Sequence, residues 1–166
     1  MEHQQIIKLK SAEGEIFPVD VKMARLSHTL ATMLDDLCHQ SSGSEEEIII
    51  LPNISTPILK KVVEWFEHYK NNPPVVPEYD EEERRSDDVP AWDAQFLVVD
   101  HDTLFGIIKA SNYLDIKGLL TSSCKTLANM IKGRPAEEVR ATFNLKNDFT
   151  PEEEEAIKKE NAWCED

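Results

Sequence analysis

The alternation of apolar and polar residues near the start of the chain predicts a β-hairpin. Residues 6–10 and 16–21 are two short runs typical of strands, and the polar segment 11–15 between them contains Gly14, which can supply a positive φ angle. Further on, the apolar residues recur at steps of three and four, as on one face of a helix: Leu26, Leu30, Met33, Leu34 and Leu37. A polar loop at 39–47 then leads to the apolar run 48–51, which predicts a strand buried on both faces.

A strongly amphipathic helix is predicted after Pro52. Ser55 or Thr56 can cap this helix, and Pro57 suits its first turn, where the missing N–H costs nothing. Its apolar stripe consists of Ile58, Leu59, Val62, Val63, Phe66 and Tyr69. The segment 71–91 that follows is rich in proline and acidic residues, so we expect an extended and largely disordered linker.

The last third of the chain has the spacing of helices. One helix is predicted over 102–114 and a second over 116–132, closed by Gly133. Pro135 opens a short helix, and Thr150 with Glu153 forms a capping box that opens the last one at Pro151. The sequence therefore predicts an α/β chain of the α+β type, with strands at its start and helices to its end.

Composition narrows the kinds of partner that the protein can have. The chain has 166 residues and a net charge of −14 at pH 7, and its pI is near 4.7. This excess has the wrong sign for binding nucleic acid or an anionic membrane. Most of the excess lies in four acidic runs, at 45–47, 78–93, 152–155 and 165–166, so the rest of the chain is close to neutral.

The location of the protein follows from its cysteines and its first residues. Cys38, Cys124 and Cys164 are odd in number and far apart, which argues against a disulfide framework and a zinc site and favours a reducing compartment. The first residues lack the pattern of a signal peptide, and no apolar run is long enough to span a membrane. We expect an intracellular protein of the cytoplasm and nucleus, in which the glycosylation sequon at Asn53 is silent.

Catalytic motifs are absent from the sequence. The five histidines show no metal-ligand spacing, and the five glycines are too scattered for a phosphate loop or a nucleophile elbow. We therefore expect no enzyme, no metal and no cofactor. Phe143, Phe149 and Trp163 lie near helix caps or near residue 166, where little chain remains to cover them. They indicate either a binding face or aromatic residues that fold back onto their own helices, and the residues alone leave both interpretations open.

Several long segments resemble one known family. The chain reads Glu13-Gly14-Glu15-Ile16-Phe17, Leu51-Pro52-Asn53, Asn112-Tyr113-Leu114-Asp115-Ile116-Lys117-Gly118 and Ala128-Asn129-Met130-Ile131-Lys132-Gly133, and its tail from Phe143 to Cys164 continues the match. These segments are similar to the S-phase-kinase-associated adaptors of SCF ubiquitin ligases. The resemblance covers nearly the whole chain.

The resemblance implies a BTB/POZ domain with a three-stranded sheet, followed by a helical extension. Residues 1–70 would hold the strands and first helices, 71–91 the linker, 92–132 the remaining BTB/POZ helices and 133–166 the extension. Such adaptors are not enzymes, and they bridge the N-terminal domain of a cullin to F-box proteins. The resemblance assigns cullin binding to Asn112 and Tyr113. It assigns F-box binding to Leu120, Cys124, Leu127, Ile131, Phe143 and Trp163.

Some positions depart from the family pattern and suggest a divergent paralogue. Gly106 and Lys109 replace residues that are usually Glu and Leu, and 121–123 read Thr-Ser-Ser in place of Asp-Val-Thr. A second hypothesis therefore stays open, in which the protein is a scaffold that forms a homodimer through its BTB/POZ part and binds cullin weakly or not at all. Pro151 also has two interpretations, because the matching proline is hydroxylated and glycosylated in some unicellular members but is also a common helix start.

Overall fold

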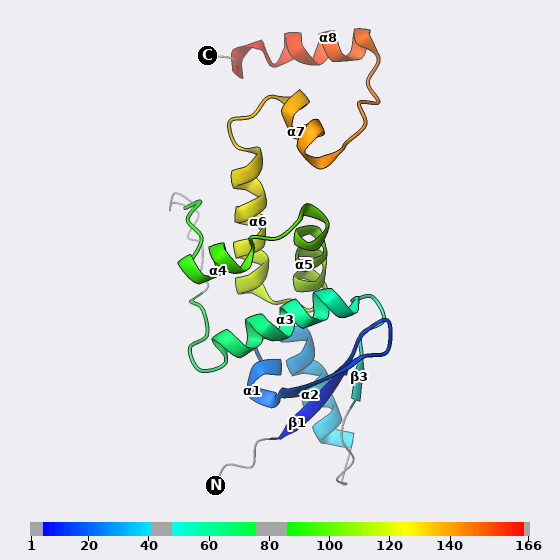
Figure 1. Ribbon diagram of the computed structural model, residues 1–166, viewed down its shortest axis with the longest axis vertical. Coiled ribbons are helices and arrows are strands. Elements are labelled where there is room, and N and C mark those ends of the chain that lie inside the picture. Colours follow the sequence, from blue (N-terminus) through cyan, green and yellow to red (C-terminus); the bar gives the residue numbers. More distant parts are fainter. Residues whose placement is uncertain (1–4, 41–47, 76–85, 165–166) are drawn as a thin grey trace. The chain divides into compact units, whose positions relative to one another are not determined.

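The structure, a computed structural model, describes residues 5–40, 48–75 and 86–164, and of 37–40 it describes only the helix that they form. The chain divides into two compact units, Met1–Met130 and Ile131–Asp166. The elements are β1 (Ile6–Lys10), β2 (Ile16–Asp20), α1 (Val21–Ala24), α2 (His28–Gln40), β3 (Ile48–Ile50), α3 (Thr56–Tyr69), α4 (Ala91–Phe96), α5 (His101–Tyr113), α6 (Lys117–Ile131), α7 (Ala136–Phe143), α8 (Pro151–Glu160) and a 3-10 helix, Ala162–Cys164 (Figure 1). The predicted α+β class is confirmed.

The three strands form one sheet in the order β2-β1-β3. The hairpin is confirmed, since β1 and β2 pair antiparallel from Ile6 opposite Asp20 to Lys10 opposite Ile16. Gly14 in its turn has φ +94°, the conformation for which glycine is suited. β3 pairs parallel to β1, with Ile49 opposite Leu9. The first unit therefore has β1 at the centre of its sheet.

The strand at 48–50 differs from the prediction in its burial. Ile49 is buried, but Ile48 and Ile50 are 50% and 62% exposed. The prediction that this strand is buried on both faces was wrong, because β3 pairs with β1 alone among the described strands, and only one face of this sheet packs on the core. Ile6 and Ile16 are exposed as well, so the outer face of the sheet carries four isoleucines.

Helix α3 packs at the centre of the first unit, where it contacts β2, α1 and α5 (Figure 1). The predicted stripe is confirmed, with Leu59, Val62, Phe66 and Tyr69 buried and Ile58 and Val63 partly buried against the core. The prediction missed Trp65, which is only 1% exposed. Tryptophan often keeps one edge in water, so its residue type gave little reason to place it at the centre of the core.

The first turn of α3 is capped by the hairpin and not by its own preceding residue. Ser55 occupies the N-cap position but makes no side-chain cap bond. Instead the Glu13 carboxylate accepts hydrogen bonds from the backbone N–H of Thr56 at 2.7 Å and from its hydroxyl at 2.8 Å. The Thr56 hydroxyl, followed by its N–H, holds the pKa of Glu13 below the ordinary value. A residue 43 positions away thus completes the start of this helix.

Helix α4 is joined to α3 and α6 through a buried carboxyl group. Asp93 is 1% exposed and accepts from the Tyr69 hydroxyl at 2.9 Å and from the Ser122 hydroxyl at 2.5 Å. Burial, followed by the neighbouring Asp93, raises the pKa of Tyr69. The sequence predicted helices beyond residue 92 but named none at 91–96, directly after the predicted linker 71–91. Residues 76–85 of that linker lie outside the described residues. The same holds for 41–47 in the predicted polar loop, whereas residues 39 and 40 belong to α2.

The second unit contains the two short helices that were predicted, α7 and α8. The capping box at the start of α8 is confirmed, since the Thr150 side chain accepts from the Glu153 N–H and the Glu153 carboxylate accepts from the Thr150 N–H. Gly133, which follows α6, has φ +72° as a helix terminator requires. No residue of α7 or α8 is buried, so this unit has no packed interior of its own among the residues described.

Candidate functional site

The predicted cullin-binding residues, Asn112 and Tyr113, form the exposed last turn of α5. The backbone of this turn is fixed by the start of α2. The buried Ser27 hydroxyl donates to the Leu114 carbonyl at 2.5 Å, and the Thr29 hydroxyl donates to the Tyr113 carbonyl at 3.3 Å. These bonds satisfy carbonyl groups that a helix end leaves unpaired. The structure thus holds the two residues together on a rigid, solvent-facing turn.

A tight turn connects α5 to α6 and sets where α6 begins. Asp115 has a left-handed conformation with φ +49°, and the Ile116 N–H donates to the Ser111 carbonyl at 2.8 Å, as in a Schellman motif. Aspartate tolerates this conformation better than most residues that carry a side chain. Because α6 begins at Lys117, directly after this turn, the turn fixes where α6 starts relative to the end of α5.

Two of the predicted F-box residues, Leu120 and Cys124, line the same cavity. The volume of this cavity is about 360 Å³. It is lined by Ser86, Asp87, Leu120, Thr121, Cys124, Lys125 and Ala128. Burial raises the pKa of the Cys124 thiol. Leu127 lies further along α6 and packs partly against the core of the first unit. The sequence prediction did not include Ala128, although it follows Cys124 by one helical turn.

The other wall of this cavity is the segment before α4, which α6 holds by its polar side chains. The Lys125 ammonium donates to the Asp88 carbonyl at 3.4 Å, and the Asn129 amide donates to the Asp87 carbonyl at 3.2 Å. Neither contact could be predicted from spacing, because the partners are 37 and 42 residues apart. The cavity therefore has a helical apolar wall and an extended polar wall.

The remaining predicted F-box residues, Ile131, Phe143 and Trp163, belong to the second unit. Ile131 is exposed, Phe143 is half-buried and Trp163 is 78% exposed. Leu145, Phe149 and Ile157 are exposed apolar side chains of this unit as well. The sequence analysis named Phe149 as part of a candidate binding face but missed Leu145 and Ile157. The sequence feature that could have indicated these exposed residues is the high charge of α8. A helix with so little apolar surface cannot cover the apolar side chains of its own unit.

Ion pairs connect α7 to α8. The Lys158 ammonium lies 3.7 Å from a carboxylate oxygen of Glu137 and 3.7 Å from one of Glu154, and Arg140 lies 4.0 Å from Glu154. A bond from its own backbone N–H, followed by the nearby Lys158, holds the pKa of Glu137 below the ordinary value. The Arg140 guanidinium also lies over the Phe149 ring, 6.0 Å from its centroid, so one cation contacts both an acidic and an aromatic side chain of this unit. Pro151 is exposed at the first position of α8, where it fits a helix start.

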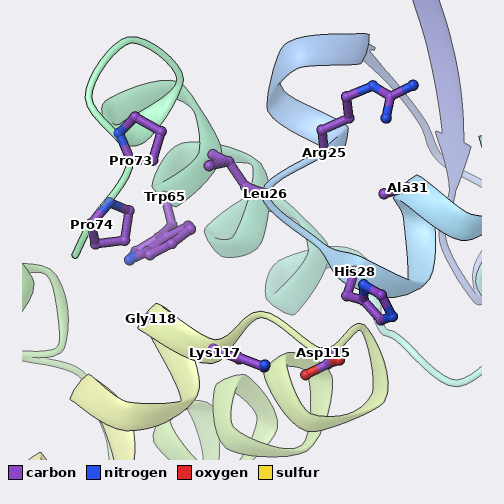
Figure 2. A pocket seen from close by; sticks show the side chains of 10 residues that line it. All are labelled: Arg25, Leu26, His28, Ala31, Trp65, Pro73, Pro74, Asp115, Lys117 and Gly118. Carbon is purple, nitrogen blue, oxygen red and sulfur yellow. The ribbon is translucent and has the colours of Figure 1, made fainter. Parts of the chain in front are cut away.

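A larger cavity of about 420 Å³ lies elsewhere in the first unit. Figure 2 shows apolar side chains on one side of it and charged ones on the other; it is lined by Arg25, Leu26, His28, Ala31, Trp65, Pro73, Pro74, Asp115, Lys117 and Gly118. The backbone N–H of His28 donates to the Asp115 carbonyl at 3.2 Å, so the start of α2 and the turn after α5 meet at this cavity.

The described residues also lack other features of a catalytic or membrane-bound site. No group of three or more histidine, cysteine or acidic side chains in them could hold a metal ion. Across the same residues, no helix is both long and apolar enough to cross a bilayer. The surfaces built from exposed apolar side chains on α5, on α6 and in the second unit are thus the most prominent candidates for function.

Comparisons with known proteins match both parts of the chain. Residues 5–71 match a family model described as "Skp1 family, tetramerisation domain", and residues 117–164 match one described as "Skp1 family, dimerisation domain". The first match covers the sheet and α1 to α3, which fits the predicted POZ domain. The second covers α6 to α8 and begins at residue 117, before residue 133 where the predicted helical extension starts.

Whole-chain relatives are found in three distant organisms. The chain is 53% identical over 161 residues to a "Skp1-related protein" of Caenorhabditis elegans, with 96% of this chain and 92% of the relative covered. It is 46% identical over 160 residues to an "E3 ubiquitin ligase complex SCF subunit sconC" of Talaromyces stipitatus, covering 96% and 97%. It is 45% identical over 161 residues to an "SCF ubiquitin ligase complex protein SKP1a" of Dictyostelium discoideum, covering 97% and 96%. On this identity over nearly its full length, the chain belongs to the Skp1 family.

Proposed function

We propose that the protein is a non-catalytic adaptor subunit of an SCF-type cullin–RING ubiquitin ligase. The observation that carries this proposal is its identity of 45% and 46%, over nearly the whole chain, with relatives named as SCF subunits. In this role the first unit binds the N-terminal domain of a cullin through Asn112 and Tyr113. The α6 residues and the second unit bind F-box proteins, so that a substrate held by the F-box protein comes near the ubiquitin-charged E2.

The exposed apolar residues support this role over that of an enzyme. A helix of an F-box protein that lies in a groove requires apolar side chains at helical spacing and an aromatic anchor. Leu120 and Cys124 supply the spacing along α6, and the exposed Trp163 can supply the anchor. Such contacts bind and orient a partner and need no reacting group, which agrees with the absence of catalytic motifs from the sequence.

Co-purification tests the proposal directly. The full chain is mixed separately with an F-box domain and with a cullin N-terminal fragment, and each mixture is run on a size-exclusion column. We expect a stoichiometric complex with each, and a ternary complex when all three are present. If a chain that is folded by circular dichroism binds no F-box domain, the adaptor proposal is wrong.

The self-associating scaffold is a second candidate, favoured by the outer face of the sheet. Ile6, Ile16, Ile48 and Ile50 are exposed there, and apolar side chains of this kind can pair two copies of a chain. Light scattering at micromolar concentration separates the two candidates. A stable dimer that excludes the cullin fragment favours the scaffold, whereas a monomer that binds the fragment favours the adaptor.

A further inference from the structure

The exposed face of α5 is a stripe of four residues with one charge in it. Phe105, Lys109, Asn112 and Tyr113 follow one another at steps of four, three and one, so they lie along one side of the helix. Phe105 is 36% exposed and Tyr113 41%, and Lys109 and Asn112 are exposed as well. We call these four residues the α5 stripe. Lys109 lies one turn from the aromatic residue at each end of it.

Among the residues that the structure describes, none supplies a counter-charge to Lys109. The helix positions three and four residues away from it are Phe105, Gly106, Asn112 and Tyr113, none of which is acidic. No ion pair or hydrogen bond of its ammonium group is present in the described part of the chain. Other lysines do have such partners, since Lys61 pairs with Glu64 and Lys158 with Glu154.

Helices α3 and α5 meet closely at Gly106, one turn before Lys109. A Cβ atom at Gly106, one turn before Lys109, would lie 2.5 Å from the Ile58 Cδ1 atom. The Ile58 side chain therefore occupies the space that a side chain at 106 would fill, and α3 and α5 approach closely at this point.

A partner that covers this stripe removes the Lys109 ammonium group from water. Removing a charge from water is costly unless a group of opposite charge meets it, and the stripe itself supplies two aromatic rings, one hydroxyl and one amide but no carboxylate. We infer that Lys109 selects, among cullin-type partners, one that places a carboxylate opposite it within an otherwise apolar patch. This inference rests on the proposed function, since it concerns the same face as Asn112 and Tyr113. Lys109 then determines which cullin-type partner binds, and its effect is not merely to weaken the binding of all of them.

The experiment measures binding of the full chain to N-terminal fragments of several cullins by titration calorimetry. The variants are Lys109→Glu, Lys109→Leu and Lys109→Arg. Lys60→Glu is the matched control, because Lys60 is exposed on α3 and the substitution changes the net charge by the same amount. Binding to an F-box domain is measured for each variant to show that the other surface is intact.

We expect Lys109→Glu to weaken binding to the preferred fragment by about 30-fold or more, and Lys109→Leu by roughly tenfold. Lys109→Arg and Lys60→Glu should stay within about threefold of the unchanged chain. In a second arm, each acidic residue of the preferred fragment is changed to lysine in turn. One of these changes should restore the affinity that Lys109→Glu loses.

Two results would overturn the inference while leaving the adaptor role intact. Lys109→Leu could tighten binding to every fragment alike, which would make the lysine only a defect. Alternatively, no acidic residue of the fragment could restore binding of Lys109→Glu. If instead neither the unchanged chain nor any variant binds a cullin fragment, the cullin half of the proposed function fails, and this inference fails with it.

Discussion

At the scale of single residues, the buried Asp93 shows how a departure from the family pattern fits into the core. Ser122 on α6 stands where the family usually has valine, and from the sequence alone this change suggests the loss of an apolar contact. The structure shows that the Ser122 hydroxyl instead donates to the Asp93 carboxyl, which Tyr69 also bonds. The serine is therefore matched to a polar partner on α4 and not simply a loss of packing.

We predict that Ser122→Ala lowers the free energy of unfolding by about 1–3 kcal/mol, because it leaves a buried carboxyl oxygen without its donor. Ser123→Ala is the matched control. Its hydroxyl is also buried on α6 but donates to the Leu119 carbonyl of the same helix, so this change should cost only about 0.5–1.5 kcal/mol. Urea unfolding followed by circular dichroism gives both values, and an equal loss in the two variants would contradict the prediction.

At the scale of elements, the start of α3 depends on the turn of the β-hairpin. The pKa of Glu13 is lowered by Thr56, so the capping bond stabilises the fold above the unfolded-state pKa, which is about 4.3 for glutamate. This stabilisation is lost as the pH falls through the lower folded-state pKa. Acid should therefore weaken the joint between the hairpin and α3.

We predict that Glu13→Gln lowers the free energy of unfolding at pH 7 and flattens its fall between roughly pH 5 and pH 3. Glu15→Gln, in the same turn, is the control, because no side-chain bond of Glu15 caps a helix among the described residues. Unfolding in urea at a series of pH values measures both. The prediction is wrong if the two variants show the same slope against pH.

The elements also show which parts of the fold could be predicted from the sequence. The hairpin, α3, α5, α6 and the capping box of α8 were predicted because each depends on local spacing or on residues within one turn. The cap of α3, the burial of β3 and the position of Asp93 were not, since each depends on residues more than 20 positions apart. Sequence spacing alone does not contain those contacts.

The candidate site follows the same division. Asn112 and Tyr113 are adjacent in sequence and share one turn, and Leu120 with Cys124 is one helical step, so local spacing was enough to group them. The polar wall that Asp87 and Asp88 form beside α6 could not be predicted in this way. The roles of all these residues came from a family resemblance and remain predictions.

At the scale of the whole molecule, the aromatic residues of the two proposed binding surfaces belong to different units. Tyr113 lies on α5 of the first unit and Trp163 in the second unit. Tyr113 is 41% exposed and Trp163 78% exposed, and neither belongs to the buried core. Their removal should change binding and leave folding nearly unaffected.

We predict that Trp163→Ala weakens F-box binding by about 30-fold, with cullin binding within roughly threefold of the unchanged chain, and that Tyr113→Ala does the reverse. The double variant should combine both losses without extra coupling. Val98→Ala is the control, because Val98 is 82% exposed and belongs to neither surface. Calorimetry gives the affinities, and a thermal melt shows whether each variant is folded. A loss of both activities in one single variant would contradict the prediction.

The four exposed isoleucines on the outer face of the sheet also affect how the isolated protein behaves in solution. Copies of a chain with a net charge of −14 repel one another, and this repulsion keeps their apolar faces apart. Salt shortens the range of that repulsion from about 10 Å at 0.1 M to about 3 Å at 1 M, and acid removes its source near the pI of 4.7. The net negative charge of the chain thus opposes association of two copies through the sheet face that carries the exposed isoleucines.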